Sequence, residues 1–132
     1  MLVLLDTDIC IYLIREQPDT IVDRFTRYAI GDIGISTITL AELEYGISKS
    51  SKPARNREAL GQFTTPLVIV EFDRPASVAY GQLRATLEKK GQMIGGMDLL
   101  IAAHAVSLNI PIVTHNVREF RRVPGLRVET WN

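Results

Sequence analysis

The sequence contains a single cysteine, Cys10, and no uninterrupted apolar stretch that approaches the length of a membrane helix. One cysteine cannot form an internal disulfide, and such scarcity is typical of a protein kept in a reducing cytoplasm. Because a helix needs about 20 consecutive apolar residues to cross a bilayer, the sequence predicts no transmembrane segment. The apolar run at residues 1–5 is too short for a signal peptide, and acidic residues follow it at once. We therefore expect a cytoplasmic protein.

The chain also lacks net charge, since 15 Lys and Arg balance 15 Asp and Glu. This balance excludes a uniformly basic surface of the kind that binds nucleic acid without specificity. The charges are nonetheless segregated: residues 1–48 hold eight acidic and three basic residues, and residues 49–132 hold seven acidic and twelve basic ones. Basic runs at 49–57 and 118–122 are candidates for phosphate contacts, although either run alone is more typical of a solvated surface.

No internal repeat, low-complexity tract or linker divides the 132 residues, so we expect a single domain over residues 1–132. Short apolar runs rich in β-branched residues alternate with stretches of helical periodicity. This alternation predicts βαβ units, and hence an α/β fold: a three-layer α/β/α sandwich with a central parallel sheet. The expected strands are 2–5, 33–36, 67–72, 110–114 and 126–130, and the expected helices are 9–14, 20–28, 39–48, 55–64, 75–90 and 98–108, with a short turn at 117–122.

Acidic and amide side chains stand where several of these elements begin or end. Asp6 closes the first strand, Glu42 and Asp98 lie near the starts of two helices, and Asn116 follows the fourth strand. Because ligands bind at the carboxyl edge of open parallel sheets, we expect these four residues to meet there. Three carboxylates at one place repel each other unless a cation joins them, and oxygen ligands favour Mg²⁺ or Mn²⁺ over zinc.

Each of these residues also has a purely structural explanation. Asp98 has the character of an N-cap, and Thr39 and Glu42 have the spacing of a capping box. Either Asp6 or Asp8 can cap the helix that follows the first strand, and an amide after a strand can form an Asx-turn. Taken singly, the two explanations are about even. Their common location at one sheet edge favours a functional site.

Five segments of the chain resemble the motifs of PIN-domain proteins, and specifically of the VapC toxins of bacterial toxin–antitoxin pairs. The resemblance extends over nearly the whole chain, with the motifs in order and at suitable spacing. The segments are LDTDICIYLI (5–14), ISTITLAEL (35–43) followed by Tyr45-Gly46, IGGMDLLIAA (94–103), VTHNVREF (113–120) and PGLRVETW (124–131).

The resemblance implies a Mg²⁺-dependent endoribonuclease, with Mn²⁺ able to substitute. It implies that Asp6, Asp98 and Glu42 hold the metal and that Asn116 completes the catalytic set, with Thr114 supporting the pocket through its hydroxyl. A metal-activated water would attack a phosphodiester of RNA in line and leave a 5′-phosphate and a 3′-hydroxyl.

The resemblance also implies partners: an RNA substrate, with transfer RNA as the best single expectation, a VapB-type antitoxin that blocks the acidic pocket, and a homodimer. Three positions depart from the family pattern. Asn116 stands where many members have Asp, which leaves a second metal ion in question. Asp8 stands where most have Asn, and Met97 replaces a polar residue before Asp98.

Two alternatives stay open on the sequence. One is a PIN nuclease that processes RNA without an antitoxin; a neighbouring reading frame for an antitoxin would separate the two. The other is a Mg²⁺-binding receiver-type signalling domain, which would gather Asp73 with the acids after the first strand. That class requires a lysine after its last strands, whereas no lysine follows Lys90, and it gives no role to Glu42 or Asp98.

Three further residues receive structural expectations. His104 lies in an apolar helical stretch and is more typical of a core histidine than of a ligand. His115 adjoins Asn116, where it is close enough in sequence to approach a substrate. Trp131 is expected to pack back onto the sheet.

Overall fold

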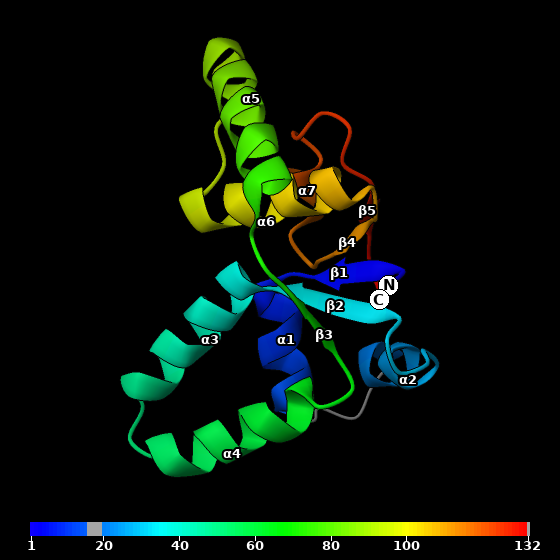
Figure 1. Cartoon of the computed structure of the whole chain (residues 1–132), viewed down its shortest axis with the longest axis vertical. Helices are drawn as coiled ribbons and strands as arrows, with labels where there is room; N and C mark the ends of the chain where they lie inside the picture. Colours follow the sequence, from blue (N-terminus) through cyan, green and yellow to red (C-terminus); the bar gives the residue numbers. More distant parts are fainter. Residues whose placement is uncertain (16–19, 132) are drawn as a thin grey trace.

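The computed structural model describes residues 1–15 and 20–131, which form a parallel five-stranded sheet in the order β3-β2-β1-β4-β5 (Figure 1). The predicted α/β fold with a central parallel sheet is confirmed, although most strands are shorter than predicted. The strands are β1 Val3–Leu5, β2 Ile33–Ser36, β3 Val68–Val70, β4 Ile112–Val113 and β5 Val128–Glu129. The helices are α1 Thr7–Ile14, α2 Thr20–Thr26, α3 Thr37–Ser48, α4 Pro53–Thr64, α5 Arg74–Lys90, α6 Gly96–Leu108 and α7 Val117–Phe120.

Strand β1 is the centre of the sheet and is buried on both faces. It pairs in parallel with β2, where Val3 aligns with Ile33, and with β4, where Leu4 aligns with Ile112. Leu5 joins the apolar core formed with α1 to α4, whereas Leu4 joins the core formed with α5 to α7. Figure 1 shows these two helical layers on opposite sides of the sheet. A strand with apolar neighbours on both faces has to be continuously apolar, as the first five residues are.

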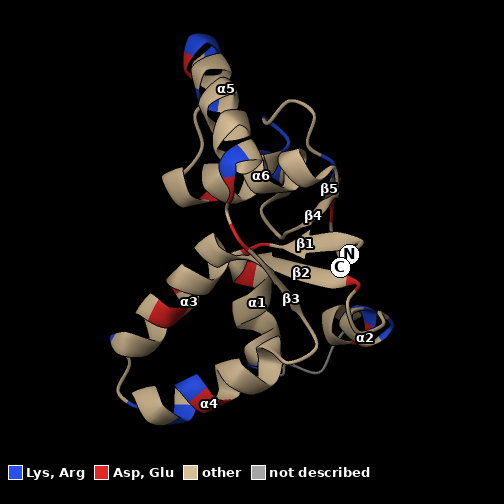
Figure 2. Cartoon of the chain, viewed as in Figure 1, with Lys and Arg blue, Asp and Glu red and all other residues tan. Residues whose placement is uncertain are grey.

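Helix α5 extends away from the body and packs chiefly on α6 (Figure 1). Leu83 and Leu87 are buried in that contact. The last turn of α5 carries Lys89 and Lys90, which make its free end basic (Figure 2). None of the helices in the described ranges is long and apolar enough to cross a membrane.

Most helices begin one or two residues earlier than the sequence predicted, and the early starts of α6 and α3 bear on the candidate site. Helix α6 starts at Gly96 with Gly95 as its N-cap, so Asp98 lies in the first turn and is not the cap. Helix α3 starts at Thr37 and is capped by Ser36, whose Oγ accepts the Ile38 N–H at 3.0 Å. The predicted capping box at Thr39 is therefore wrong. Serine immediately before the helix satisfies one of the free N–H groups of the first turn, that of Ile38, and Glu42 is available for other contacts.

A buried contact between Ser36 and His104 joins the start of α3 to α6. His104 Nδ1 lies 2.8 Å from Ser36 Oγ, and neither residue is exposed to solvent. The imidazole also packs edge-on against Phe72, with ring centroids 5.3 Å apart. Burial lowers the pKa of His104 below its ordinary value, so the ring is neutral at physiological pH. The expectation of a core histidine is confirmed, and the contact fixes α3 against α6.

Replacing Ser36 with Ala should destabilise the protein. The change removes the N-cap of α3 and the buried partner of His104, so we expect the free energy of unfolding to fall by about 1–3 kcal/mol. Urea denaturation monitored by circular dichroism measures this value. Ser51→Ala, at an exposed position in the connection between α3 and α4, is the matched control and should change stability by less than about 0.5 kcal/mol. Equal stabilities of the two variants would contradict the assigned role of Ser36.

Candidate active site

Asp6 is an almost fully buried carboxylate at the carboxyl end of β1. Its exposed fraction is 2%, and both of its oxygens accept hydrogen bonds. Oδ1 accepts the Ile9 N–H at 2.9 Å and thereby caps α1, while Oδ2 accepts the Thr114 hydroxyl at 2.5 Å. The capping explanation for Asp6 is therefore correct, and Asp8 is not the cap. Capping uses only one oxygen, however, so it does not account for the contact with Thr114.

The electrostatics of Asp6 oppose its ionisation. Its pKa is raised to about 6, chiefly because burial penalises the charged form. The hydrogen bonds from Thr114 and Ile9 counteract this effect, the negative charge of Asp8 adds to it, and His115 lowers the pKa slightly. His115 is exposed and contacts Tyr12 edge-on, with ring centroids 5.7 Å apart. It therefore lies close enough to Asp6 to influence its charge.

Asp98 reaches the same place from the first turn of α6. Its pKa is raised to about 7, first by burial and then by the negative charges of Glu119 and Asp6, with a smaller effect from Asp8. A charge effect of Asp6 on the pKa of Asp98 requires the two carboxylates to lie near each other. The structure thus brings Asp6 and Asp98 together, as the sequence predicted, although α6 is far from β1 in the chain.

Glu119 is an acid of the site that the sequence analysis missed. Its Oε1 accepts the Gly95 N–H at 2.7 Å, and its Oε2 accepts the side-chain amide of Asn116 at 2.6 Å. The pKa of Glu119 is lowered, mainly by the bond from Gly95. The available signal was its position three residues after Asn116 in a helical turn, which places both on one face. Because Glu119 lies within the basic run 118–122, the sequence analysis interpreted the whole segment as a phosphate-contacting or solvated surface.

Asn116 is oriented from both sides. Its backbone N–H donates to Thr114 Oγ1 at 2.9 Å, and Thr114 in turn donates to Asp6. Its amide nitrogen donates to Glu119, so the carbonyl oxygen of the amide is the end left for a ligand. The chain of contacts from Asp6 through Thr114 and Asn116 to Glu119 and Gly95 joins β1, β4, α7 and the start of α6. An Asx-turn is not the role of this residue.

Glu42 stands on α3 at the head of a groove beside this cluster. Thr7 Oγ1 donates to Glu42 Oε1 at 2.6 Å and also lies 3.3 Å from the hydroxyl of Thr39. The carboxylates that raise the pKa of Asp98 include Asp8 but not Glu42. The acids whose charges raise the pKa of Asp98 are therefore Glu119, Asp6 and Asp8, and Glu42 adjoins them across Thr7.

The groove has a volume of about 860 Å³ and runs between α1, α3 and α4. Its lining is largely apolar, but Thr7, Asp8 and Glu42 belong to it, as does Met97 at the start of α6. An elongated molecule lying in this groove would therefore reach the acidic cluster.

The donors at this edge suit a hard divalent cation. No three acidic, histidine or cysteine side chains of residues 1–15 and 20–131 are already arranged to enclose a metal ion. Mg²⁺ does not need such an enclosure, because it keeps several waters and binds proteins through one or two carboxylates. Asp6 and Asp98 offer two, and burial, together with the neighbouring carboxylates, raises the pKa of both.

The raised pKa of Asp98 predicts a specific pH dependence of stability in chelator. Between its ordinary value of 3.8 and about 7, the folded protein binds more of this proton than the unfolded chain does. The contribution of Asp98 to stability therefore falls as pH rises through that window. The unfolding free energy of Asp98→Asn, minus that of wild type, should increase from about pH 5 to about pH 8. Urea titrations measure it.

Asp23→Asn, on the exposed face of α2, is the control for this experiment. The unfolding free energy of this variant, minus that of wild type, should show no comparable rise between about pH 5 and about pH 8. A flat difference for Asp98→Asn would mean that Asp98 ionises as freely in the folded protein as in the unfolded chain.

Residues 3–126 match the family model of the PIN domain. The chain is 44% identical to Ribonuclease VapC2 of Rickettsia felis over 133 aligned residues, which cover 100% of this chain and 99% of that protein. It is 42% identical to the tRNA(fMet)-specific endonuclease VapC of Salmonella typhimurium, with 97% and 96% of the two chains covered.

Solved structures give the same result. The crystal structure of DNA-bound VapBC from Salmonella typhimurium includes a chain of 42% identity that superposes with a TM-score of 0.95, covering 100% of both chains. The crystal structure of VapBC2 from Rickettsia felis bound to a promoter DNA fragment gives a TM-score of 0.94 at 44% identity, again over 100% of both. The chain therefore belongs to the PIN-domain family and, within it, to the VapC ribonucleases of VapBC toxin–antitoxin modules.

Proposed function

We propose that this protein is a metal-dependent endoribonuclease that acts as the toxin of its module. The observation that supports this most strongly is the cluster of partly buried carboxylates at the carboxyl edge of the sheet, where burial and neighbouring acids raise the pKa values of Asp6 and Asp98 to about 6 and about 7. In this proposal Asp6 and Asp98 hold Mg²⁺, for which Mn²⁺ substitutes. Glu42 is the third acid, and Asn116 completes the catalytic set.

The protein's part in catalysis is to hold these groups in place. When bound, Mg²⁺ would polarise a phosphoryl oxygen of RNA and lower the pKa of a water molecule. Asp6 is fixed by Ile9 and Thr114, so its carboxylate cannot turn away from the site. Thr7 holds one oxygen of Glu42 and leaves the other for a water molecule. Asn116 and Glu119 brace the opposite side.

Cleavage of RNA by the purified protein tests this proposal. Asp6→Asn and Asp98→Asn should each lower kcat by more than the roughly 10- to 100-fold that follows loss of a residue supporting a metal ligand. Glu119→Gln, which keeps the shape but weakens the bonds to Gly95 and Asn116, should fall within that smaller range. Excess chelator should abolish cleavage, and Mg²⁺ or Mn²⁺ should restore it.

Asp23→Asn on α2 is again the control and should cleave like wild type. Cleavage that persists in chelator after removal of bound metal would refute the metal mechanism. Full activity of Asp98→Asn with an intact circular dichroism spectrum would remove Asp98 from the site.

We further propose transfer RNA as the substrate, with tRNA(fMet) as the first choice. Two relatives, from Salmonella typhimurium and Shigella flexneri, are tRNA(fMet)-specific endonucleases, each 42% identical to this chain over nearly its full length. Single-stranded loops of a transfer RNA present a phosphodiester between unstacked bases, which an acidic site at the edge of the sheet can reach.

The partner in the proposal is a VapB-type antitoxin that covers the acidic cluster, as VapC relatives have been crystallised in VapBC complexes. Homodimer formation is part of the same proposal and rests on the family resemblance. The receiver-type alternative loses its basis, because the chain belongs to the PIN family and Asp73 caps α5 through the Ala76 N–H at 3.1 Å. A PIN nuclease without an antitoxin remains the second candidate.

Expression of the protein in bacteria, followed by sequencing of RNA 5′ ends, tests substrate and partner together. We expect new 5′-phosphate ends in one or a few transfer RNAs, with growth arrest that co-expression of the adjacent antitoxin relieves. The Asp98→Asn variant should give neither the ends nor the arrest. Cleavage spread over messenger RNA would contradict the substrate, and arrest that no neighbouring reading frame relieves would favour the RNA-processing alternative.

A further inference from the structure

Three chemically different side chains lie along one face of α3. Glu42, Tyr45 and Lys49 are spaced by three and then four residues, which places them one above another on a helix. All three line the groove between α1, α3 and α4. A carboxylate, an aromatic ring and a cation therefore follow in that order, starting at the acidic cluster and moving away from it.

Tyr45 is unusual for a tyrosine of a folded domain because 66% of its surface is exposed. The Lys49 ammonium lies 4.8 Å from the centroid of its ring, so one face of the ring is already matched by a cation. Met97 lines the same groove from the start of α6 and is 51% exposed. The ring thus presents a flat apolar surface to solvent close to Glu42, at a place where it contributes little to the core.

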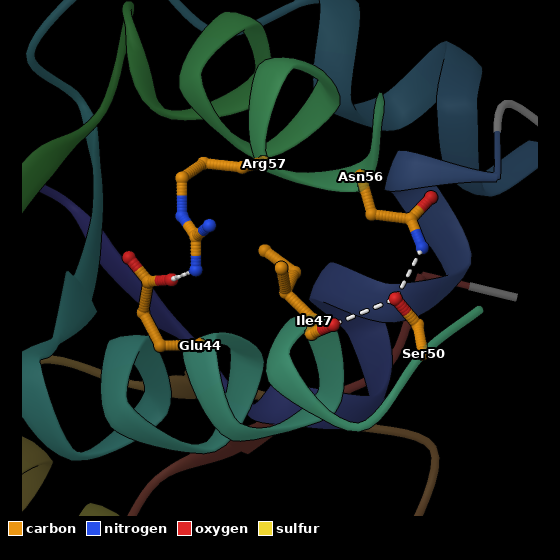
Figure 3. Close-up of polar contacts among 5 residues, drawn as sticks. All are labelled: Glu44, Ile47, Ser50, Asn56 and Arg57. Carbon is orange, nitrogen blue, oxygen red and sulfur yellow. Dashed lines mark hydrogen bonds and ion pairs between the residues drawn. The ribbon is translucent and has the colours of Figure 1, made fainter. Parts of the chain in front are cut away.

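The opposite wall of the groove is held by contacts between α3 and α4 (Figure 3). Arg57 forms an ion pair with Glu44 at 3.3 Å, and Asn56 donates to Ser50 Oγ at 3.0 Å, while Ser50 donates to the Ile47 carbonyl. Exposed contacts of this kind add little stability, and they show where α4 lies alongside α3. They also pair the charge of Glu44, the acid that directly precedes Tyr45, with Arg57.

We propose that Tyr45 and Lys49 form a subsite for an unpaired nucleotide of the RNA substrate, with its base stacked on the Tyr45 ring and its phosphate beside Lys49. This inference rests on the proposed ribonuclease function and specifies where the RNA strand extends away from the acidic cluster. An exposed aromatic face with an adjacent cation is the arrangement that proteins use to bind single-stranded nucleic acid. A paired base cannot stack on a side chain in this way, so the subsite selects a loop or an unpaired end.

Steady-state kinetics of RNA cleavage separate this role from a structural one. Tyr45→Ala should raise KM about tenfold with kcat changed less than about twofold, since loss of one base–aromatic stack weakens binding by that order. Tyr45→Phe keeps the ring and should behave like wild type. Lys49→Gln should raise KM and make it less dependent on salt, because one phosphate contact is lost.

Tyr80→Ala and Lys89→Gln on α5 are controls outside the groove; Lys89 is exposed like Lys49, whereas Tyr80 is partly buried, so its variant is compared for KM only. Both should leave KM unchanged. Circular dichroism verifies that each variant is folded.

The substrate side of the contact is tested with an RNA that lacks one base next to the cut. Wild type should show the raised KM on this RNA, and Tyr45→Ala should show no additional increase, because the stack is already absent. Binding of a single-stranded RNA carrying 2-aminopurine at that position to the Asp98→Asn variant gives a readout independent of cleavage. Quenching of the fluorophore should disappear in the double variant with Tyr45→Ala and remain with Tyr45→Phe.

The failures of the two proposals are distinguishable. A wild-type protein that cleaves no RNA refutes the ribonuclease proposal. A wild-type protein that cleaves RNA, while Tyr45→Ala has an unchanged KM and quenches 2-aminopurine normally, refutes the subsite alone. Weaker affinity of Tyr45→Ala for the antitoxin together with an unchanged KM for RNA would assign the ring to a protein contact and would equally overturn the inference.

Discussion

The arrangement of this protein depends on one buried carboxylate at the end of its central strand. Asp6 is 2% exposed, and without partners a charge in such a position is very unfavourable. Its two oxygens are occupied by different elements: the Ile9 N–H begins α1, and the Thr114 hydroxyl ties the end of β4 to the end of β1. A single side chain therefore sets the direction in which the chain leaves the sheet and joins the two strands whose ends form the pocket. The cost of burying it is only partly offset, as the raised pKa shows.

Around this carboxylate, the other acids are placed by helix starts rather than by loops. Asp98 lies in the first turn of α6 and Glu42 in the second turn of α3, and the buried contact of Ser36 with His104 fixes these two helices against each other. Glu119 reaches Gly95, the N-cap of α6, from the short helix α7. Residues on rigid elements hold their positions more accurately than residues on loops, so the site is organised before any ligand arrives.

Much of this could be predicted from the sequence because the signals are local. An apolar run that ends in an acid indicates a buried strand and its terminus, and alternating strands and helices indicate a parallel sheet; both expectations were confirmed. The predicted start of α3 was wrong because Thr39 and Glu42 have the spacing of a capping box, whereas Ser36 caps the helix three residues earlier by accepting the Ile38 N–H. Glu119 was missed because its partner Gly95 is 24 residues away and its neighbours are basic. The groove was also beyond prediction, since its walls come from three helices.

In the proposed function, the site and the groove beside it have different physical requirements: one clusters carboxylates and the other binds a nucleic-acid strand. In the proposed metal site, the carboxylates must stay close together and partly buried, so that a cation would interact strongly with them. Such clustering costs stability when no cation is bound, as is common at functional sites. Recognition of a long, negatively charged strand makes the opposite demand, for exposed surface and positive charge. In this proposal α3 meets both demands along one face: Glu42 lies in its second turn beside the acids, and Tyr45 and the C-cap residue Lys49 follow toward its end, exposed to solvent. Because α3 bears both groups, helix geometry fixes the separation between Glu42 and the proposed nucleotide subsite.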